Sequence, residues 1–173
     1  MELLWNSWEN RYAKTYKSIK FNEVVFLLKD KERLEGEDIY LSLERTEGAN
    51  PDKGYVPAYY FGIHRYTDDM KVGYCDLRVG HNENTKFGGN IGYAIDEEFR
   101  GHHYAGKAGL LLMDFAKEHE MTYLIITCHP ENMASRKTCE FMGAKLLEIV
   151  DVPQWHEMYL DGRIYTCRYE IKL

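Results

Sequence analysis

The sequence predicts an α/β domain in which a mixed, mostly antiparallel central sheet is flanked by helices. Two alternating apolar segments enclose a short acidic turn in the first half of the chain, which is typical of a β-hairpin. A strong helix-forming segment then separates two further apolar strands, as in a helical crossover. A second helical segment and a final hairpin complete the pattern.

A chain of 173 residues is long enough for one domain with its own core. We therefore expect residues 1–173 to form a single domain, with residues 1–36 as an N-terminal helical extension. The pattern over 21–34 is ambiguous, but residues 1–20 indicate an amphipathic helix. Apolar residues recur there at steps of three to five positions: Leu3, Leu4, Trp8, Tyr12, Tyr16 and Ile19.

The first half of the domain reads as strands joined by polar turns. Residues 39–44 alternate in the manner of a strand, and residues 46–54 are rich in turn formers. The segments 58–65 and 71–79 form the predicted hairpin. Residues 81–88 are polar, and we predict a loop there.

The second half alternates strands with helices. A helix is predicted after Arg100, and a second one opens at Asn132. A loop containing Pro153, Trp155 and Gly162 precedes the last strand. Strands are predicted at 90–95, 123–128, 145–150 and 164–171, and the first helix carries an apolar stripe of Ala105, Ala108, Leu112, Phe115 and Ala116.

Composition narrows the functional classes. The formal net charge of −6 argues against nucleic acid as the main partner and mildly favours cationic or neutral substrates. No apolar run approaches the roughly 20 residues that cross a bilayer, so we expect no membrane partner. Glu2, Asn6 and Glu9 interrupt the N-terminus, so we expect no signal peptide and a cytoplasmic protein.

Cysteine and histidine usage argues against a metal site. Cys75, Cys128, Cys139 and Cys167 are widely spaced, which is typical of reduced, buried thiols in a cytosolic protein. The adjacent pair His102-His103 points its two rings in different directions, and no further ligand follows at helical spacing. We therefore expect no bound metal.

Residues 89–105 form the most informative segment, because a strand leads there through an acidic turn into the start of a helix. A loop that enters a helix N-terminus directs several backbone N–H groups to one point, where the helix dipole adds partial positive charge. This arrangement favours phosphate. The Lys-Ser/Thr pair of an ATP-binding P-loop is absent from the segment.

Two motifs in this region resemble those of the GNAT superfamily of N-acetyltransferases. The acetyl-CoA-binding pattern of that family is Arg/Gln-x-x-Gly-x-Gly/Ala, which Arg100, His103 and Ala105 match except that His103 replaces a glycine. The second family motif is Asn-x-x-Ser/Ala before a short helix that closes on glycine, which Asn132, Ser135 and Gly143 match. The resemblance covers roughly residues 37–173.

The resemblance implies acetyl-CoA as co-substrate. Backbone amides of the strand would contact the pantetheine arm and the loop would hold the pyrophosphate. Ordinary turn glycines, a capping role for Arg100 and an N-cap role for Asn132 are the structural alternatives. The implied cofactor contacts are Ile91, Gly92, Tyr93, Ala94, Ile95, Arg100, Gly101, His102, His103, Tyr104, Ala105, Gly106, Asn132 and Ser135.

The acid and base of the reaction are less clear from the sequence. Many GNAT enzymes use a Glu on the strand at 90–95, which this chain lacks, so Asp76, His81 and Glu83 are the candidate bases. A structural ion pair between Asp76 and Arg78 and a merely solvated loop are the alternatives. The family's usual acid, a Tyr, is replaced by Cys139, which we interpret as packing.

The acceptor is expected to be a small amine or a peptide amine, and a second copy of the chain is a further candidate partner. The last loop often covers the acceptor site in this family, whereas Trp155 could instead pack into the core. The alternative function is a non-catalytic acyl-CoA-binding or regulatory module. The candidate acceptor contacts are Arg78, Asn90, Trp155 and Tyr159.

Overall fold

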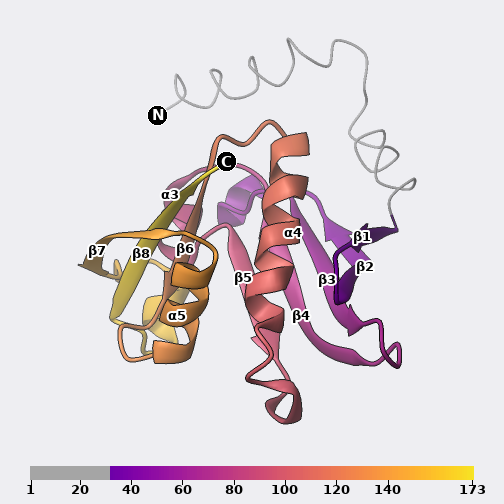
Figure 1. Cartoon of the computed structure of the whole chain (residues 1–173). Coiled ribbons are helices and arrows are strands. Elements are labelled where there is room, and N and C mark those ends of the chain that lie inside the picture. The colour runs from indigo at the N-terminus through magenta and orange to yellow at the C-terminus, as the bar shows by residue number, and fades with distance from the viewer. Residues whose placement is uncertain (1–31) are drawn as a thin grey trace, which may run out of the picture. The chain divides into compact units, whose positions relative to one another are not determined.

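The computed structural model describes residues 32–173, which form two antiparallel sheets flanked by helices (Figure 1). The predicted helix at 1–20 lies outside the described residues. The first sheet has the strand order β1 (Arg33–Glu35), β2 (Ile39–Glu47), β3 (Ala58–Arg65), β4 (Lys71–Arg78), β5 (Ile91–Ile95). The second has the order β6 (Tyr123–Cys128), β8 (Tyr165–Lys172), β7 (Lys145–Asp151).

Helices cover the sheets and fill the connections between strands. Figure 1 shows α4 lying across the first sheet and α5 lying beside the second. The helix α4 packs against β2, β4 and β5, and α5 packs against α4 and β6. The helical elements are η1 (Pro51–Lys53), α3 (Glu83–Gly88), η2 (Glu97–Phe99), α4 (Tyr104–Glu118), α5 (Met133–Phe141) and α6 (Glu157–Leu160).

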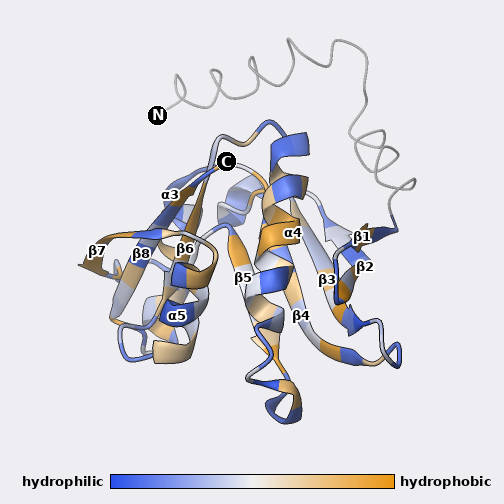
Figure 2. Cartoon of the chain, in the orientation of Figure 1, coloured by the Kyte–Doolittle hydropathy of each residue, from blue (hydrophilic) through white to orange (hydrophobic). Residues whose placement is uncertain are grey.

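The main core lies between α4 and the first sheet. Phe115 of α4 meets the rings of Tyr59 and Phe61 edge to face, with ring centroids 5.3 and 5.7 Å apart. Leu41 and Leu112 are fully buried at this contact layer. Figure 2 shows the corresponding alternation of hydrophobic and hydrophilic residues along α4. Ala108, Leu112, Phe115 and Ala116 of the predicted apolar stripe are buried on this side of the helix, whereas Ala105 is half-buried.

The predicted hairpin is confirmed, since β3 pairs with β4 in antiparallel register. The prediction of a loop over 81–88 is wrong, because α3 occupies Glu83–Gly88. The physical reason is a capping box, in which the Asn82 side chain accepts from the Thr85 N–H while the Thr85 hydroxyl accepts from the Asn82 N–H. The predicted loop before the last strand likewise contains the short helix α6.

Asn90 links the two sheets by hydrogen bonds of its backbone and its side chain. The Asn90 N–H donates to the Ile125 carbonyl at 2.6 Å, and the Ile125 N–H donates to Asn90 Oδ1 at 2.9 Å. The Asn90 amide nitrogen also donates to the carbonyls of Arg78 and Gly80 at 3.0 and 2.8 Å. Within the described residues β5 and β6 form no ladder beyond this point, so their facing edges are left free.

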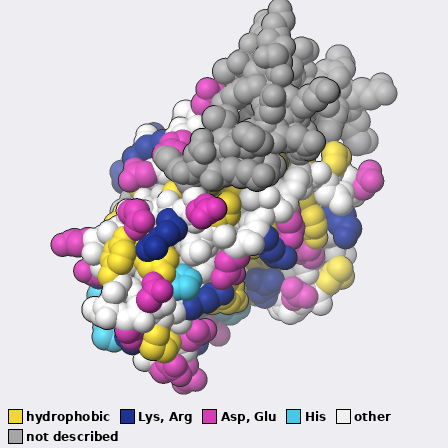
Figure 3. All heavy atoms as spheres, turned by 90° about the vertical axis from the view of Figure 1, so that its right-hand side faces the viewer, with side chains coloured by type: hydrophobic (Ala, Val, Ile, Leu, Met, Phe, Trp, Pro, Cys, Tyr) yellow, Lys and Arg dark blue, Asp and Glu magenta, His cyan; other side chains and the backbone are white. Residues whose placement is uncertain are grey.

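The surface of the described part carries charged side chains as well as exposed large hydrophobic ones. On the face shown in Figure 3, acidic and basic side chains are intermixed. Among residues 32–173, no helix is long and apolar enough to cross a membrane.

We expect Asn90→Ala to lower the free energy of unfolding by about 3 kcal/mol. The substitution leaves the Ile125 N–H and the carbonyls of Arg78 and Gly80 buried without their side-chain partner. Urea unfolding at pH 7 measures the change. The matched control is Asn50→Ala, which removes only an exposed cap of η1 and should cost about 1 kcal/mol or less. If both variants lose the same free energy of unfolding, the side-chain hydrogen bonds of Asn90 do not stabilise the junction of the two sheets.

Candidate functional site

A cavity of about 310 Å³ opens where β5 and β6 separate. We call it the cleft cavity. Strand β5 supplies one wall, and the end of β6 with the start of α5 supplies the other. The lining residues are Arg78, Gly88, Ile91, Gly92, Tyr93, Thr127, Cys128, His129, Asn132, Ser135, Met158, Arg163 and Tyr165.

A second cavity of about 200 Å³ adjoins the first. We call it the side cavity. Arg78, Gly88, Met158 and Arg163 line both cavities, so the two meet at these residues. The other lining residues are Gly54, Tyr55, Val56, Ala58, Asn84, Thr85, Gly89, His156 and Glu157.

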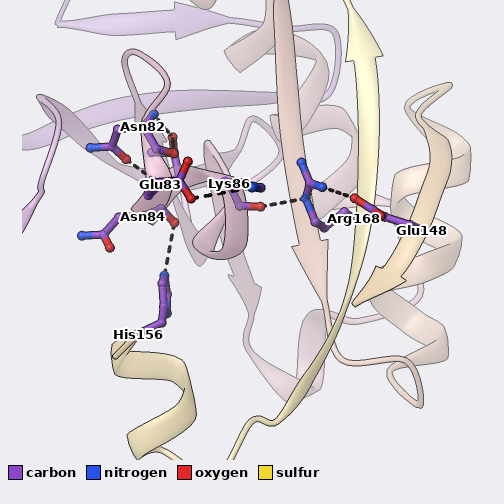
Figure 4. A network of polar contacts seen from close by, with 8 residues as sticks. Asn82, Glu83, Asn84, Lys86, Glu148, His156 and Arg168 are labelled. Carbon is purple, nitrogen blue, oxygen red and sulfur yellow. Dashed lines mark hydrogen bonds and ion pairs between the residues drawn. The ribbon is translucent and has the colours of Figure 1, made fainter. Parts of the chain in front are cut away.

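Hydrogen bonds between distant parts of the chain hold the walls of the side cavity together. The side-chain amides of Asn82 and Asn84 donate to the Gly54 carbonyl at 2.7 and 3.0 Å. His156 Nε2 donates to the Asn84 carbonyl at 3.2 Å, a contact visible in Figure 4. The Tyr55 hydroxyl donates to Glu157 at 2.8 Å. The loop before β3, α3 and α6 are therefore linked around the cavity.

The buried His156 also fixes the start of α6. Its Nδ1 accepts from the Met158 N–H at 3.2 Å. Because Nδ1 accepts and Nε2 donates, both ring nitrogens are used by neutral imidazole. On the other side of α3, Arg168 donates to the Lys86 carbonyl at 2.9 Å and pairs with Glu148, as Figure 4 shows. The helix α3 is thus tied to both α6 and β8.

Two left-handed residues shape the loop that enters α4. Gly101 has φ = +91° and His103 has φ = +59°, so the chain turns sharply before the helix begins at Tyr104. The first-turn N–H groups of a helix have no carbonyl within the helix to bind. A Cβ at Gly101 would meet no atom within 4 Å, so this side of the loop is open. The Arg100 guanidinium donates to the Ile95 carbonyl at 3.1 Å, at the end of β5.

The other residues of this loop pack against neighbouring rings. His103 stacks on Phe141 with ring centroids 5.0 Å apart, and His102 stacks on Tyr104 at 5.4 Å. Gly106 is buried, and a Cβ there would come within 2.3 Å of the Phe141 ring. A glycine at this position allows α4 to approach the end of α5, which is a packing role.

Tyr93 crosses the cleft cavity from β5 to α5. Its hydroxyl lies 2.8 Å from Ser135 Oγ and 3.9 Å from Cys139 Sγ, and burial raises the pKa of Tyr93. The Asn132 side chain accepts from the Ser135 N–H at 3.0 Å and also lines the cavity. Asn132 therefore acts as an N-cap and faces the cleft cavity at once.

Asp76 lies against β5 on the face of the first sheet opposite α4. A Cβ at Gly92 would come within 2.3 Å of Asp76 Oδ1, so the glycine makes room for the carboxylate. Burial raises the pKa of Asp76, although Arg78 at 3.1 Å opposes the shift. That contact is an ion pair without hydrogen-bond geometry, and Asp76 Oδ2 has no hydrogen-bond partner among residues 32–173. The carboxylate is thus close to the cleft cavity and poorly solvated.

The other two candidate bases lie elsewhere. His81 stacks on Tyr123 with ring centroids 3.9 Å apart, and burial lowers its pKa. Glu83 is exposed and pairs with Lys86 at 3.6 Å, although its neighbour Asn84 lines the side cavity. Asp76, His81 and Glu83 all lie outside the lining of the two cavities, but Asp76 pairs with Arg78, which lines both.

The candidate acceptor contacts divide in the same way. Arg78 lines both cavities and donates to the carbonyls of Gly88 and Gly89 at 3.0 and 3.2 Å. Asn90, Trp155 and Tyr159 line neither cavity. Asn90 is fully buried at the sheet junction, and the exposed Trp155 meets Phe87 edge to face.

Sequence reasoning did not single out Tyr55, Glu157 or Arg163 as site residues. Tyr55 directly follows the turn-rich segment 46–54, Glu157 is the first residue of α6, and Arg163 lies between α6 and β8. These three residues belong to no sequence motif, so their place in the cavity lining is seen only in the folded structure.

Three thiols gather behind the cleft cavity. Cys128 lines it, and hydrogen bonding from Cys139 lowers the pKa of Cys128 while raising that of Cys139. Cys167 lies opposite Cys128 on β8. The described cysteines are all free thiols. Within residues 32–173 no group of three or more His, Cys, Asp or Glu side chains is arranged to hold a metal ion.

Solved structures similar to this chain are acetyltransferases of the same fold. A candidate ribosomal-protein-serine acetyltransferase from Vibrio cholerae has 16% identity and a TM-score of 0.61, with 83% of this chain and 98% of that chain covered. RimL, a ribosomal L7/L12 α-N-protein acetyltransferase in complex with coenzyme A, has 14% identity and a TM-score of 0.59, with 82% and 98% covered.

A third similar structure contains the acetyl donor. MccE, a microcin C7 self-immunity acetyltransferase in complex with acetyl-CoA and AMP, has 18% identity and a TM-score of 0.53, with 71% of this chain and 63% of that chain covered. At these identities the likeness shows the fold alone. A comparison with curated protein sequences gave no significant match.

The family is shown by the sequence itself. The family model described as an acetyltransferase (GNAT) domain matches residues 13–145, which is more than half of the chain. The matched range contains β5, the loop into α4 and the start of α5, and residues of β5 and of the start of α5 line the cleft cavity. The chain belongs to the GNAT acetyltransferase family.

Proposed function

We propose that the protein is an N-acetyltransferase that moves the acetyl group of acetyl-CoA to an amine. The observation that carries this proposal is the meeting of two cavities at Arg78 and Gly88. The cleft cavity runs along β5, whose free edge can pair with the pantetheine arm that carries the thioester. The side cavity leads away from that strand. Similar structures contain coenzyme A or acetyl-CoA, which supports the same donor here.

The donor would lie along the cleft cavity. The pyrophosphate would sit at the loop from Gly101 to Ala105, where first-turn N–H groups and the dipole of α4 favour negative charge. The pantetheine arm would follow the free edge of β5, whose backbone amides from Ile91 to Ile95 can pair with its amides. The thioester would then lie near the meeting point of the cavities.

The acceptor amine must lose a proton to attack the thioester carbonyl. Of the three candidate bases Asp76 is the best placed, because it is buried, lies against Gly92 and is paired with a residue that lines both cavities. The leaving thiol of coenzyme A has an ordinary pKa of about 8.5, so its thiolate departs without a strong acid. Tyr93 lines the cleft cavity, and its hydroxyl would hydrogen-bond to the thiolate.

Because the thiolate of coenzyme A leaves without a strong acid, acetyl transfer needs no Tyr at position 139. Cys139 is fully buried and packs beside Tyr93 and Cys128, which fits our interpretation of it as a packing residue. A cytoplasmic location and a second copy of the chain as partner stay predictions.

We expect Gly101→Asp to weaken acetyl-CoA binding at least tenfold, because the new carboxylate faces the proposed pyrophosphate. The matched control is Gly101→Asn, which has nearly the same shape, tolerates the positive φ of +91° and adds no charge. Calorimetric titration of the folded variants with acetyl-CoA measures both. Similar affinities for the Asp and Asn variants would place the phosphates elsewhere.

We expect Asp76→Asn to lower kcat by about 10²–10⁴-fold, the range of a lost general base. In the wild type, the raised pKa of Asp76 means that the carboxylate gains a proton at a higher pH than usual. Activity should therefore fall as the pH drops through that raised pKa, and the Asn variant should lose this inflection. The pH profile of kcat, followed by thiol release with a panel of amines, measures the effect.

Stability distinguishes this role from a structural one. A carboxylate whose pKa is raised by folding stabilises the protein only when protonated, and this contribution is lost as the pH rises through the folded pKa. Asp76→Asn should therefore keep or raise the melting temperature at pH 7 while it lowers turnover. A lower melting temperature with unchanged turnover would make the Asp76–Arg78 pair structural. Acetyl-CoA binding without turnover of any amine would favour the non-catalytic module.

A further inference from the structure

The meeting point of the two cavities is lined by positive charge. Arg78 and Arg163 line both cavities, so two arginines border the place where the thioester would lie. Among the residues that line the side cavity, Glu157 is the one carboxylate, and the Tyr55 hydroxyl already donates to it at 2.8 Å. The meeting point therefore favours an acceptor that carries an anionic group beside its amine.

The two arginines differ in how freely they can bind a ligand. Arg78 is held by Asp76 at 3.1 Å and by the Gly88 carbonyl at 3.0 Å. The Arg163 side chain is half exposed, and its described ionic partner is the exposed Asp161 at 3.1 Å. Exposed pairs of this kind contribute about 0–1 kcal/mol. Arg163 can therefore exchange Asp161 for a ligand carboxylate, which a guanidinium binds through two parallel hydrogen bonds.

The side cavity has room for a small acceptor. Its volume of about 200 Å³ corresponds to roughly seven water molecules at ~30 Å³ each. The hydrogen bonds that link Gly54, Asn84, His156 and Glu157 to their neighbours hold its walls in place. The cavity is therefore preformed for a small molecule.

We propose that the acceptor is a free α-amino acid whose carboxylate binds Arg163. This inference rests on the proposed function. One carbon separates an α-amine from its carboxylate, so an amine at the thioester keeps the carboxylate at the meeting point. The same positive charge disfavours the protonated ammonium form of the acceptor. The amino acid side chain then extends into the side cavity, toward Tyr55 and Asn84.

The transfer itself balances without a further reactant. The amine nitrogen forms a bond to the acetyl carbonyl carbon, and the bond from that carbon to sulfur breaks. Coenzyme A leaves as the thiolate, and the amine gives up one proton to the base. The products are an N-acetyl amino acid and coenzyme A, so a carboxylate remains beside the arginines after the reaction.

The test compares L-amino acids with their carboxamides as acceptors, using the full chain, acetyl-CoA and thiol release. We expect the wild type to prefer the acids. Arg163→Gln should raise KM for the acids at least tenfold with kcat within about twofold, and should leave KM for the carboxamides unchanged. Arg163→Lys should lie between the two. The matched control is Arg33→Gln, because Arg33 is also half exposed and paired with an exposed carboxylate two positions away, Glu35 at 3.4 Å.

Equal or better turnover of the carboxamides, with no effect of Arg163→Gln, would overturn the inference and point to a peptide N-terminus as acceptor. Absence of turnover with every amine would contradict the proposed function instead. Binding then decides the inference, through calorimetric titration of N-acetyl amino acids and their carboxamides into protein saturated with coenzyme A. Tighter binding of the acids that is lost in Arg163→Gln supports it, and equal binding overturns it.

Discussion

The hydrogen bonds between Asn90 and Ile125 are the contact on which the rest of the site depends. They join the two sheets at one point and leave the strands free to separate beyond it. The side chain of Asn90 also binds the carbonyls of Arg78 and Gly80, so the same residue fixes the end of β4. A buried amide with all its polar atoms bound is rigid, because any shift would leave several of them unpaired. The cleft cavity exists because the pairing stops there.

Loops rather than strands form most of the side cavity. Hydrogen bonds between these loops take the place of the backbone pairing that holds strands together. Asn84, His156 and Glu157 each link two segments that are far apart in the chain. The links of Asn84 and His156 use backbone carbonyls, and the Glu157 carboxylate accepts from Tyr55, while Arg78 and Arg163 line both cavities. The polar walls and the position of Arg163 together define what kind of molecule the side cavity can hold.

The surroundings of Asp76 are unfavourable for stability but favourable for its proposed role as a base. Its burial against Gly92 is unfavourable for the ionised carboxylate, and Arg78 compensates only in part, since the pKa remains raised. Groups held in such surroundings are common at functional sites, where an ordinary solvated carboxylate would be a weaker base. By contrast, His81 packs on Tyr123 and Glu83 faces solvent, which gives both an adequate structural account.

The sequence by itself determined the order of strands and helices, the hairpin of β3 and β4, and the loop that enters α4, because side-chain periodicity and turn residues act locally. It missed α3, whose capping box is short and polar. Only the tertiary structure decided which polar residues meet. Trp155 and His156 are adjacent in the chain, yet only His156 lines the side cavity, and Arg78 and Arg163 come from distant parts of the chain to line the same two cavities. Such contacts depend on long-range packing and hydrogen bonds between loops, which leave no periodic pattern in the sequence.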